Sequence, residues 1–117
     1  PSMSVQDHLR LAFHRQPSET LVRALLPQGL FRKEQRKQDI AATNLLETYA
    51  LTTVANQRAD SISFGQQKLL TLACCEASGG SIFLLDEPAA GIHPQYQEAI
   101  IKRLDELAKG GRTILLI

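Results

Sequence analysis

Residues 61–94 read SISFGQQKLLTLACCEASGGSIFLLDEPAAGIHP, and this stretch decides the fold. Its first half predicts a helix over residues 63–77, followed by a turn at residues 78–80, where a serine and two glycines stand together. Residues 82–85 are all apolar and are bounded by turn residues, which is typical of a strand buried on both faces of a parallel sheet. The apolar contacts of the helix are expected from Leu69, Leu70, Leu72 and Ala73.

The chain after this stretch predicts a second helix and a second strand. Pro94 stands where a first helical position is expected, and Gly110 and Gly111 stop the helix. Its apolar face consists of Ile100, Leu104 and Leu107. Residues 113–117 predict another buried strand. A strand, a helix and a strand within about 36 residues form a right-handed crossover unit, so this end of the chain is expected to belong to an α/β sheet.

The chain before this stretch predicts helices. Ser4 and Asp7 resemble a capping box, and apolar residues then recur at helical spacing, which predicts a helix over about residues 5–15. The further elements are expected in this order: a short helix over residues 19–26, a break at residues 27–29, a helix over about residues 32–49 and a loop over residues 51–62. The front of the chain is therefore expected to be helical.

Composition narrows the class of protein. With 117 residues and a formal net charge of +1, the chain has room for one modest domain and no global field for nucleic acid or an anionic membrane. Residues 32–37 are basic, but Glu34 dilutes the charge and no aromatic residues are interleaved. We therefore interpret this tract as a solvated helix face, and no nucleic-acid partner is expected.

The two cysteines are interpreted as structural thiols. Cys74 and Cys75 are adjacent, and neighbours on one helix do not easily reach disulfide geometry, which favours a reducing, cytosolic setting. The chain's histidines are scattered without the spacing of a metal site.

Two places in residues 61–94 carry chemistry. Ser63 and Gly65 open a helix, where free backbone N–H groups favour a phosphate; the alternative is an ordinary capping box of Ser63 with Gln66. Asp86 and Glu87 stand at the carboxyl end of the first predicted strand, where α/β folds build ligand sites. One carboxylate can support Mg²⁺ while the next polarises an attacking water, the division of labour that phosphoryl transfer needs.

These residues resemble the ATP-binding subunits of ABC transporters. Ile62-Ser63-Phe64-Gly65-Gln66 resembles the ABC signature LSGGQ with Phe in place of the first Gly, a variation found in ATPases of the branched-chain amino-acid importer type. Gln67-Lys68-Leu69-Leu70 and Asp86-Glu87-Pro88-Ala89-Ala90-Gly91 also resemble that group. About 20 residues, with a helix between, separate the two motifs, and this spacing makes the combination specific.

The resemblance implies a role for each motif. Similarity to Walker B assigns Asp86 to the magnesium shell and Glu87 to the catalytic base. Ala89-Ala90-Gly91-Ile92-His93 resembles the D-loop, with His93 where an acidic residue is usual; His93 is equally well interpreted as a cap for the helix that starts at Pro94. The residues implied to contact the ATP of a partner subunit are Ser63, Phe64, Gly65 and Gln66 of the signature and Gly91 and His93 of the D-loop.

The fold class implied is α/β, a partial P-loop NTPase (ABC ATPase) core with an α-helical subdomain. Residues 1–77 are expected to form the helical subdomain and residues 78–117 part of the nucleotide-binding core. The resemblance implies ATP and Mg²⁺ as cofactors, a second ATP-binding subunit and transmembrane permease subunits as partners, and a cytoplasmic position on the inner face of the membrane. It also implies ATP hydrolysis coupled to transport, most like amino-acid import of the branched-chain type.

The sequence also departs from the family. It contains no phosphate-binding loop of the pattern Gly-x-x-x-x-Gly-Lys-Ser/Thr. The nearest fragment is Gly111-Arg112-Thr113, which has Glu106 at the position of the first Gly. We therefore expect this chain to be a fragment of the ATP-binding domain that runs from the end of the Q-loop to just before the switch histidine. We expect this fragment to be inactive alone. Cys74 stands where many members carry an arginine. The alternatives are a soluble ABC ATPase of DNA repair or chromosome maintenance and a non-catalytic relic that only binds.

Overall fold

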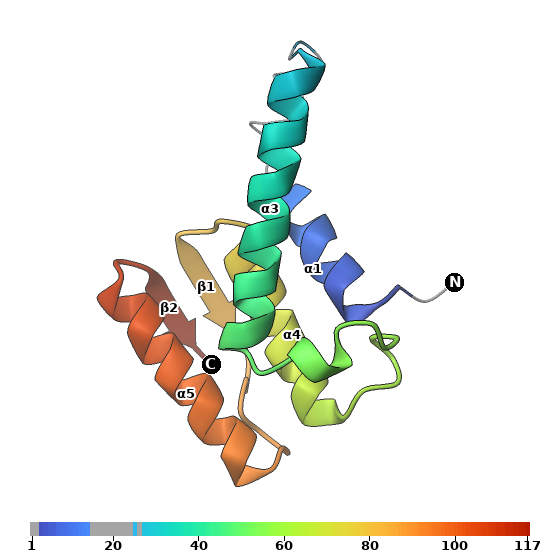
Figure 1. Ribbon diagram of the computed structural model, residues 1–117. Coiled ribbons are helices and arrows are strands. Elements are labelled where there is room, and N and C mark those ends of the chain that lie inside the picture. The colour runs from blue at the N-terminus through green and yellow to red at the C-terminus, as the bar shows by residue number, and fades with distance from the viewer. Residues whose placement is uncertain (1–2, 15–24, 26) are drawn as a thin grey trace.

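The computed structural model describes residues 3–14, 25 and 27–117 (Figure 1). Its elements, in chain order, are α1 (Val5–His14), α3 (Gln28–Thr48), the 3₁₀ turn η1 (Thr52–Val54), α4 (Phe64–Ala77), β1 (Ile82–Leu85), α5 (Pro94–Lys109) and β2 (Thr113–Leu116). This order confirms the predicted succession of helices followed by strand, helix and strand. The short helix predicted over residues 19–26 lies outside the described residues, except for Leu25, which lies in a turn.

Helix α3 starts earlier than the sequence pattern predicts. Pro27 and Gly29 were expected to break the chain, yet the helix begins at Gln28. Pro27 needs no N–H at this position, and its carbonyl accepts hydrogen bonds from the N–H groups of Leu30 and Phe31 at 3.0 and 3.2 Å. The predicted break holds at Pro27, whose backbone is not helical, but its extension over residues 28–29 was wrong, because a proline just before a helix costs no helical hydrogen bond. The first turns of α3 protrude from the other labelled elements, and the helix runs from there back to the core (Figure 1), where Ala42 and Leu46 are buried.

Helix α4 lies at the centre of the hydrophobic core. It contacts α1, α3 and α5, and its buried residues point in several directions around the helix. These residues are Gly65, Leu69, Leu70, Leu72, Ala73 and Ala77. One continuous cluster of buried side chains runs from Val5 of α1 through α4 to Leu104 of α5. A helix that is apolar on most of its surface needs neighbours on most sides, and the flanking helices supply them.

The two strands form a parallel pair joined through α5. Ile82 pairs with Thr113 and Leu84 pairs with Leu115, so paired residues share a face of the sheet. Phe83 is buried on the face that meets the helices. The exposed fractions of Ile82, Leu84 and Leu115 are 65%, 67% and 53%. The second face is thus largely exposed in this chain, as is expected of a partial core in which two strands lack the rest of their sheet and its cover.

A polar network joins three helices at the carboxyl end of α4. Arg103 of α5 makes an ion pair with Glu76 of α4, and the Tyr49 hydroxyl after α3 donates a hydrogen bond to Glu76 Oε2 at 2.7 Å. Only 15% of the Glu76 side chain and 23% of the Arg103 side chain are exposed. Burial raises the pKa of Tyr49, and the hydrogen bond to Glu76 and its negative charge raise it further. Sequence reasoning did not find this network because its members are 27 residues apart.

We expect Glu76→Gln to lower the free energy of unfolding by about 1 to 3 kcal/mol, because it removes the more buried of the two carboxylates that pair with the Arg103 guanidinium and leaves only Glu106. Chemical denaturation measures the change. Asp105→Asn is the matched control, since it removes an ion pair with Lys109 whose two side chains are well exposed, and it should leave the midpoint nearly unchanged. Equal effects of the two substitutions would contradict the assignment.

Candidate functional site

The signature residues open helix α4. Ser63 is the N-cap: its Oγ accepts a hydrogen bond from the Gln66 backbone N–H at 3.2 Å, and its own N–H donates to Gln66 Oε1 at 3.0 Å. The capping-box interpretation is therefore confirmed by geometry. The Ser63 hydroxyl acts here as an acceptor, so its hydrogen remains available to a ligand oxygen. The two interpretations of Ser63 are thus compatible with each other.

Gly65 is required by a close approach that the sequence did not reveal. A Cβ atom on Gly65 would lie 2.6 Å from Cδ2 of Tyr96, which is shorter than any van der Waals contact allows. The Tyr96 ring therefore packs directly on the backbone of the signature loop. Gly65 allows α4 and α5 to approach each other here, a reason for glycine that is independent of phosphate binding.

The D-loop residues lie beside the signature. Gly91 has a φ of +72°, in the left-handed region that favours glycine, and a Cβ atom there would lie 3.9 Å from the Phe64 ring. Phe64 itself is 58% exposed. His93 is the N-cap of α5, and its Nδ1 accepts a hydrogen bond from the Gln95 N–H at 3.3 Å. The capping role of His93 is therefore confirmed, and a role at an interface stays a prediction.

The acidic pair follows β1 directly. The Glu87 N–H donates to the Ile117 carbonyl at 3.1 Å, and this bond holds the pair against the end of β2. Glu87 has a φ of +41°, a left-handed conformation that is uncommon for a residue other than glycine. In the described part of the chain, neither the Asp86 nor the Glu87 carboxylate has a hydrogen-bond or ion-pair partner, and both residues are exposed. Both carboxylates can therefore meet a ligand.

Lys68 connects the signature helix to the acidic pair. Its Nζ donates to the Glu87 carbonyl oxygen at 2.8 Å and lies 5.3 Å from the centroid of the Phe64 ring. Sequence reasoning missed this residue. The available signal was its spacing, because Lys68 stands four residues after Phe64 and so shares its side of the helix.

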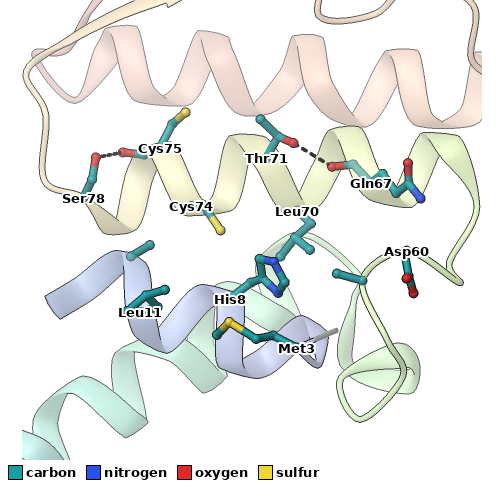
Figure 2. Close-up of a pocket in the computed structure, with 12 residues that line it drawn as sticks. Met3, His8, Leu11, Asp60, Gln67, Leu70, Thr71, Cys74, Cys75 and Ser78 are labelled. Carbon is teal, nitrogen blue, oxygen red and sulfur yellow. Dashed lines mark hydrogen bonds between the residues drawn. The ribbon is translucent and has the colours of Figure 1, made fainter. Parts of the chain in front are cut away.

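Two pockets among the described residues lie beside α4. The larger, of about 800 Å³, lies between α1 and α4 and is drawn in Figure 2; Met3, His8, Leu70 and Cys74 are among its lining residues. The smaller, of about 350 Å³, includes Lys68, Leu84 and Asp86. Of these two pockets, the smaller is the one that reaches the acidic pair, through Asp86.

The thiols on the larger pocket are not activated. Burial raises the pKa of Cys74 to about 11 and also raises the pKa of Cys75. A thiol with a raised pKa is a poor nucleophile and a poor metal ligand. No group of three or more histidine, cysteine or acidic side chains that could hold a metal is present among the described residues. The interpretation of Cys74 and Cys75 as structural thiols agrees with their raised pKa values.

Asp86 fits the magnesium position predicted for it. Mg²⁺ is commonly held by one or two carboxylates together with substrate phosphates and water, so a larger cluster of protein ligands is not required. A single exposed carboxylate at the carboxyl end of a parallel strand, without a protein partner in the described chain, meets that requirement.

Among the described residues, none of the helices combines the length and apolar composition needed to span a bilayer.

Known proteins are similar to this chain in sequence and in fold. A protein-family profile described as "AAA domain, putative AbiEii toxin, Type IV TA system" matches residues 4–117. The high-affinity branched-chain amino acid transport ATP-binding protein LivG of Escherichia coli is 32% identical over 98% of this chain and 45% of its own length. BraF of Pseudomonas aeruginosa, named for the same transport, is 32% identical over 98% of this chain and 46% of its own length.

Solved structures of ATP-binding cassettes resemble the fold of this chain. An ATP-binding cassette of an ABC transporter superposes with a TM-score of 0.73 at 26% identity, over 98% of this chain and 45% of that one. A nucleotide-free ATP-binding cassette from an ABC transporter gives a TM-score of 0.70 at 25% identity, over 99% of this chain and 45% of that one. The chain spans about half the length of the curated relatives it matches.

Fold and site together define the class: this is the P-loop ATPase fold of ABC-transporter ATP-binding domains. The chain belongs to the AAA domain family that matches residues 4–117, and its sequence supports an ATP-binding domain of the branched-chain amino-acid transport type.

Alkaline pH should weaken the fold through Cys74. The pKa of the Cys74 thiol is about 9 in the unfolded chain and is raised to about 11 in the fold. The stability that this shift contributes is therefore fully present below about pH 9 and is lost as the pH rises toward 11. The free energy of unfolding should fall by at most about 1.4 kcal/mol per pH unit for one group. Urea denaturation of the wild type and Cys74→Ala between these pH values measures it. The variant should lose stability less steeply, and identical slopes would contradict the assignment.

Proposed function

We propose that this chain is the signature-bearing part of an ATP-hydrolysing subunit that energises transport, most like import of branched-chain amino acids. The observation that carries the proposal is the pair of exposed carboxylates of Asp86 and Glu87 at the carboxyl end of β1, both without a protein partner in the described chain. Phosphoryl transfer to water needs one carboxylate for the metal and one for the water, and these two stand side by side.

In this proposal the two carboxylates act differently. Asp86 directly follows β1 and lines the smaller pocket, so it would hold Mg²⁺, which supplies charge for the phosphate oxygens. Glu87 accepts the proton of the attacking water. Its left-handed backbone turns its side chain away from the direction that the extended strand would impose, so that the two neighbouring carboxylates do not follow the usual strand alternation.

The signature and the D-loop serve the ATP of a partner subunit in this proposal. The Ser63 hydroxyl and the first N–H groups of α4 favour phosphate oxygens, because the positive end of the helix dipole lies there. Phe64 is exposed beside Gly91, which places an aromatic ring on the surface that would face the partner. Gln66 closes the capping box and keeps this helix end in position.

The relatives support a proposal for the wider assembly. We infer a helical subdomain over residues 1–77 and a core segment over residues 78–117. A second ATP-binding subunit and transmembrane permease subunits would be the partners, and the subunit would lie on the cytoplasmic face of the membrane through the permease. The names of LivG and BraF, which specify branched-chain amino acid transport, support this substrate class.

The base is tested in a subunit that joins this chain to a phosphate-binding loop. Glu87→Gln should lower kcat for ATP hydrolysis by about two to four orders of magnitude and leave ATP binding intact, because the amide cannot accept the proton while the metal and phosphate contacts remain. Glu98→Gln on α5 is the matched control, since Glu98 is exposed and has no partner in the described chain. Turnover that Glu87→Gln does not change would mean that Glu87 is not the base.

The chain by itself should bind Mg-ATP only weakly and should not turn it over. The reason is chemical: its sequence has no Gly-x-x-x-x-Gly-Lys-Ser/Thr to cradle the β and γ phosphates. Titration calorimetry of the chain with Mg-ATP measures the affinity. Micromolar binding would show that the residues of this chain suffice.

A further inference from the structure

Lys68 contacts both predicted parts of the site from one position on α4. Its ammonium group donates to the Glu87 carbonyl oxygen at 2.8 Å, and it lies over the Phe64 ring at 5.3 Å from the centroid. A cation over an aromatic face is attracted by the ring quadrupole, so Phe64 helps to hold the ammonium where it meets Glu87. Neither the signature pattern nor the acidic pair assigns a role to this lysine.

The Glu87 backbone is held from three sides. Its N–H donates to Ile117 at the end of β2, and its carbonyl accepts from the Ala90 N–H at 3.1 Å as well as from Lys68. Both lone pairs of that carbonyl are therefore used. The φ of +41° is strained for a glutamate, and such a conformation persists only where surrounding contacts over-determine it. Lys68 is the only one of these contacts that comes from a side chain.

We propose that Lys68 is a positioning residue for Glu87, and that it transmits displacements of the signature residue Phe64 to the catalytic carboxylate within one chain. The proposal rests on the proposed function for the role of Glu87. Because the contact is to the backbone, Lys68 fixes the turn and leaves the carboxylate free for water. Where two such subunits form two shared ATP sites, this contact links the signature at one site to the base at the other.

Hydrogen exchange of the chain, with resonances assigned by NMR, tests the contact without ATP. Lys68→Met removes the ammonium but keeps the stem, and it should speed exchange of the Ala90 and Glu87 amides about two- to fivefold, the effect of losing one exposed hydrogen bond. Lys68→Arg should restore protection. Lys102→Met is the control, because Lys102 is exposed on α5 without a partner in the described chain. Unchanged exchange in Lys68→Met would overturn the proposal.

Hydrolysis by a subunit that joins this chain to a phosphate-binding loop tests the consequence. Lys68→Met should lower kcat about two- to fivefold with KM little changed, and Lys68→Arg should recover most of it, because a positioning residue affects the reacting state more than ATP binding. A rise in KM at constant kcat would overturn the proposal. A wild-type subunit without turnover would refute the proposed function, and the exchange experiment would still decide whether Lys68 holds the turn.

A measurement on the wild-type chain covers the case in which Lys68→Met does not fold. An ammonium group bound between a carbonyl and a ring exchanges its protons with water more slowly than a free one does. The ¹⁵Nζ signal of Lys68 should therefore persist at mildly acidic pH while that of Lys102 is broadened away. Loss of both signals under the same conditions would overturn the proposal.

Discussion

The burial of helix α4 is the constraint on which the rest of the structure depends. Its apolar residues point to α1 and α3 on one side and to α5 on the other, so it is the element shared by every part of the core. Burying a leucine side chain contributes roughly 2 kcal/mol, and α4 buries three of them. With α4 held in this way, the signature residues at its first turn have a defined position relative to β1 and α5.

Both ends of α4 are clamped by contacts with later parts of the chain. At the first turn, the Tyr96 ring packs on the Gly65 backbone and Lys68 donates to the Glu87 carbonyl. At the last turn, Glu76 pairs with Arg103 of α5. These contacts fix the position of α4 relative to α5 and to the segment that carries the acidic pair. The same contacts that stabilise the fold thereby connect the parts of the site.

The acidic pair and the thiols differ in their exposure. Asp86 and Glu87 are exposed beside the sheet, whereas the thiols of Cys74 and Cys75 are partly buried on α4 and have raised pKa values; Cys75 also lines the smaller pocket that includes Asp86. The acidic pair keeps its charged groups in water, where a phosphate and a metal can reach them. Burial of the two thiols favours their neutral form. The candidate function therefore concentrates on the carboxyl end of β1.

Local chemistry determined much of this protein from the sequence alone. The capping box at Ser63, the apolar run of β1 and the carboxylates after it depend on neighbours a few residues away, so pattern and spacing were enough to predict them. Tertiary structure alone decided the contacts of Tyr96 with Gly65 and of Lys68 with Glu87. These depend on distances between residues about 19 to 31 positions apart, which the packing of α4 sets and which no local pattern encodes.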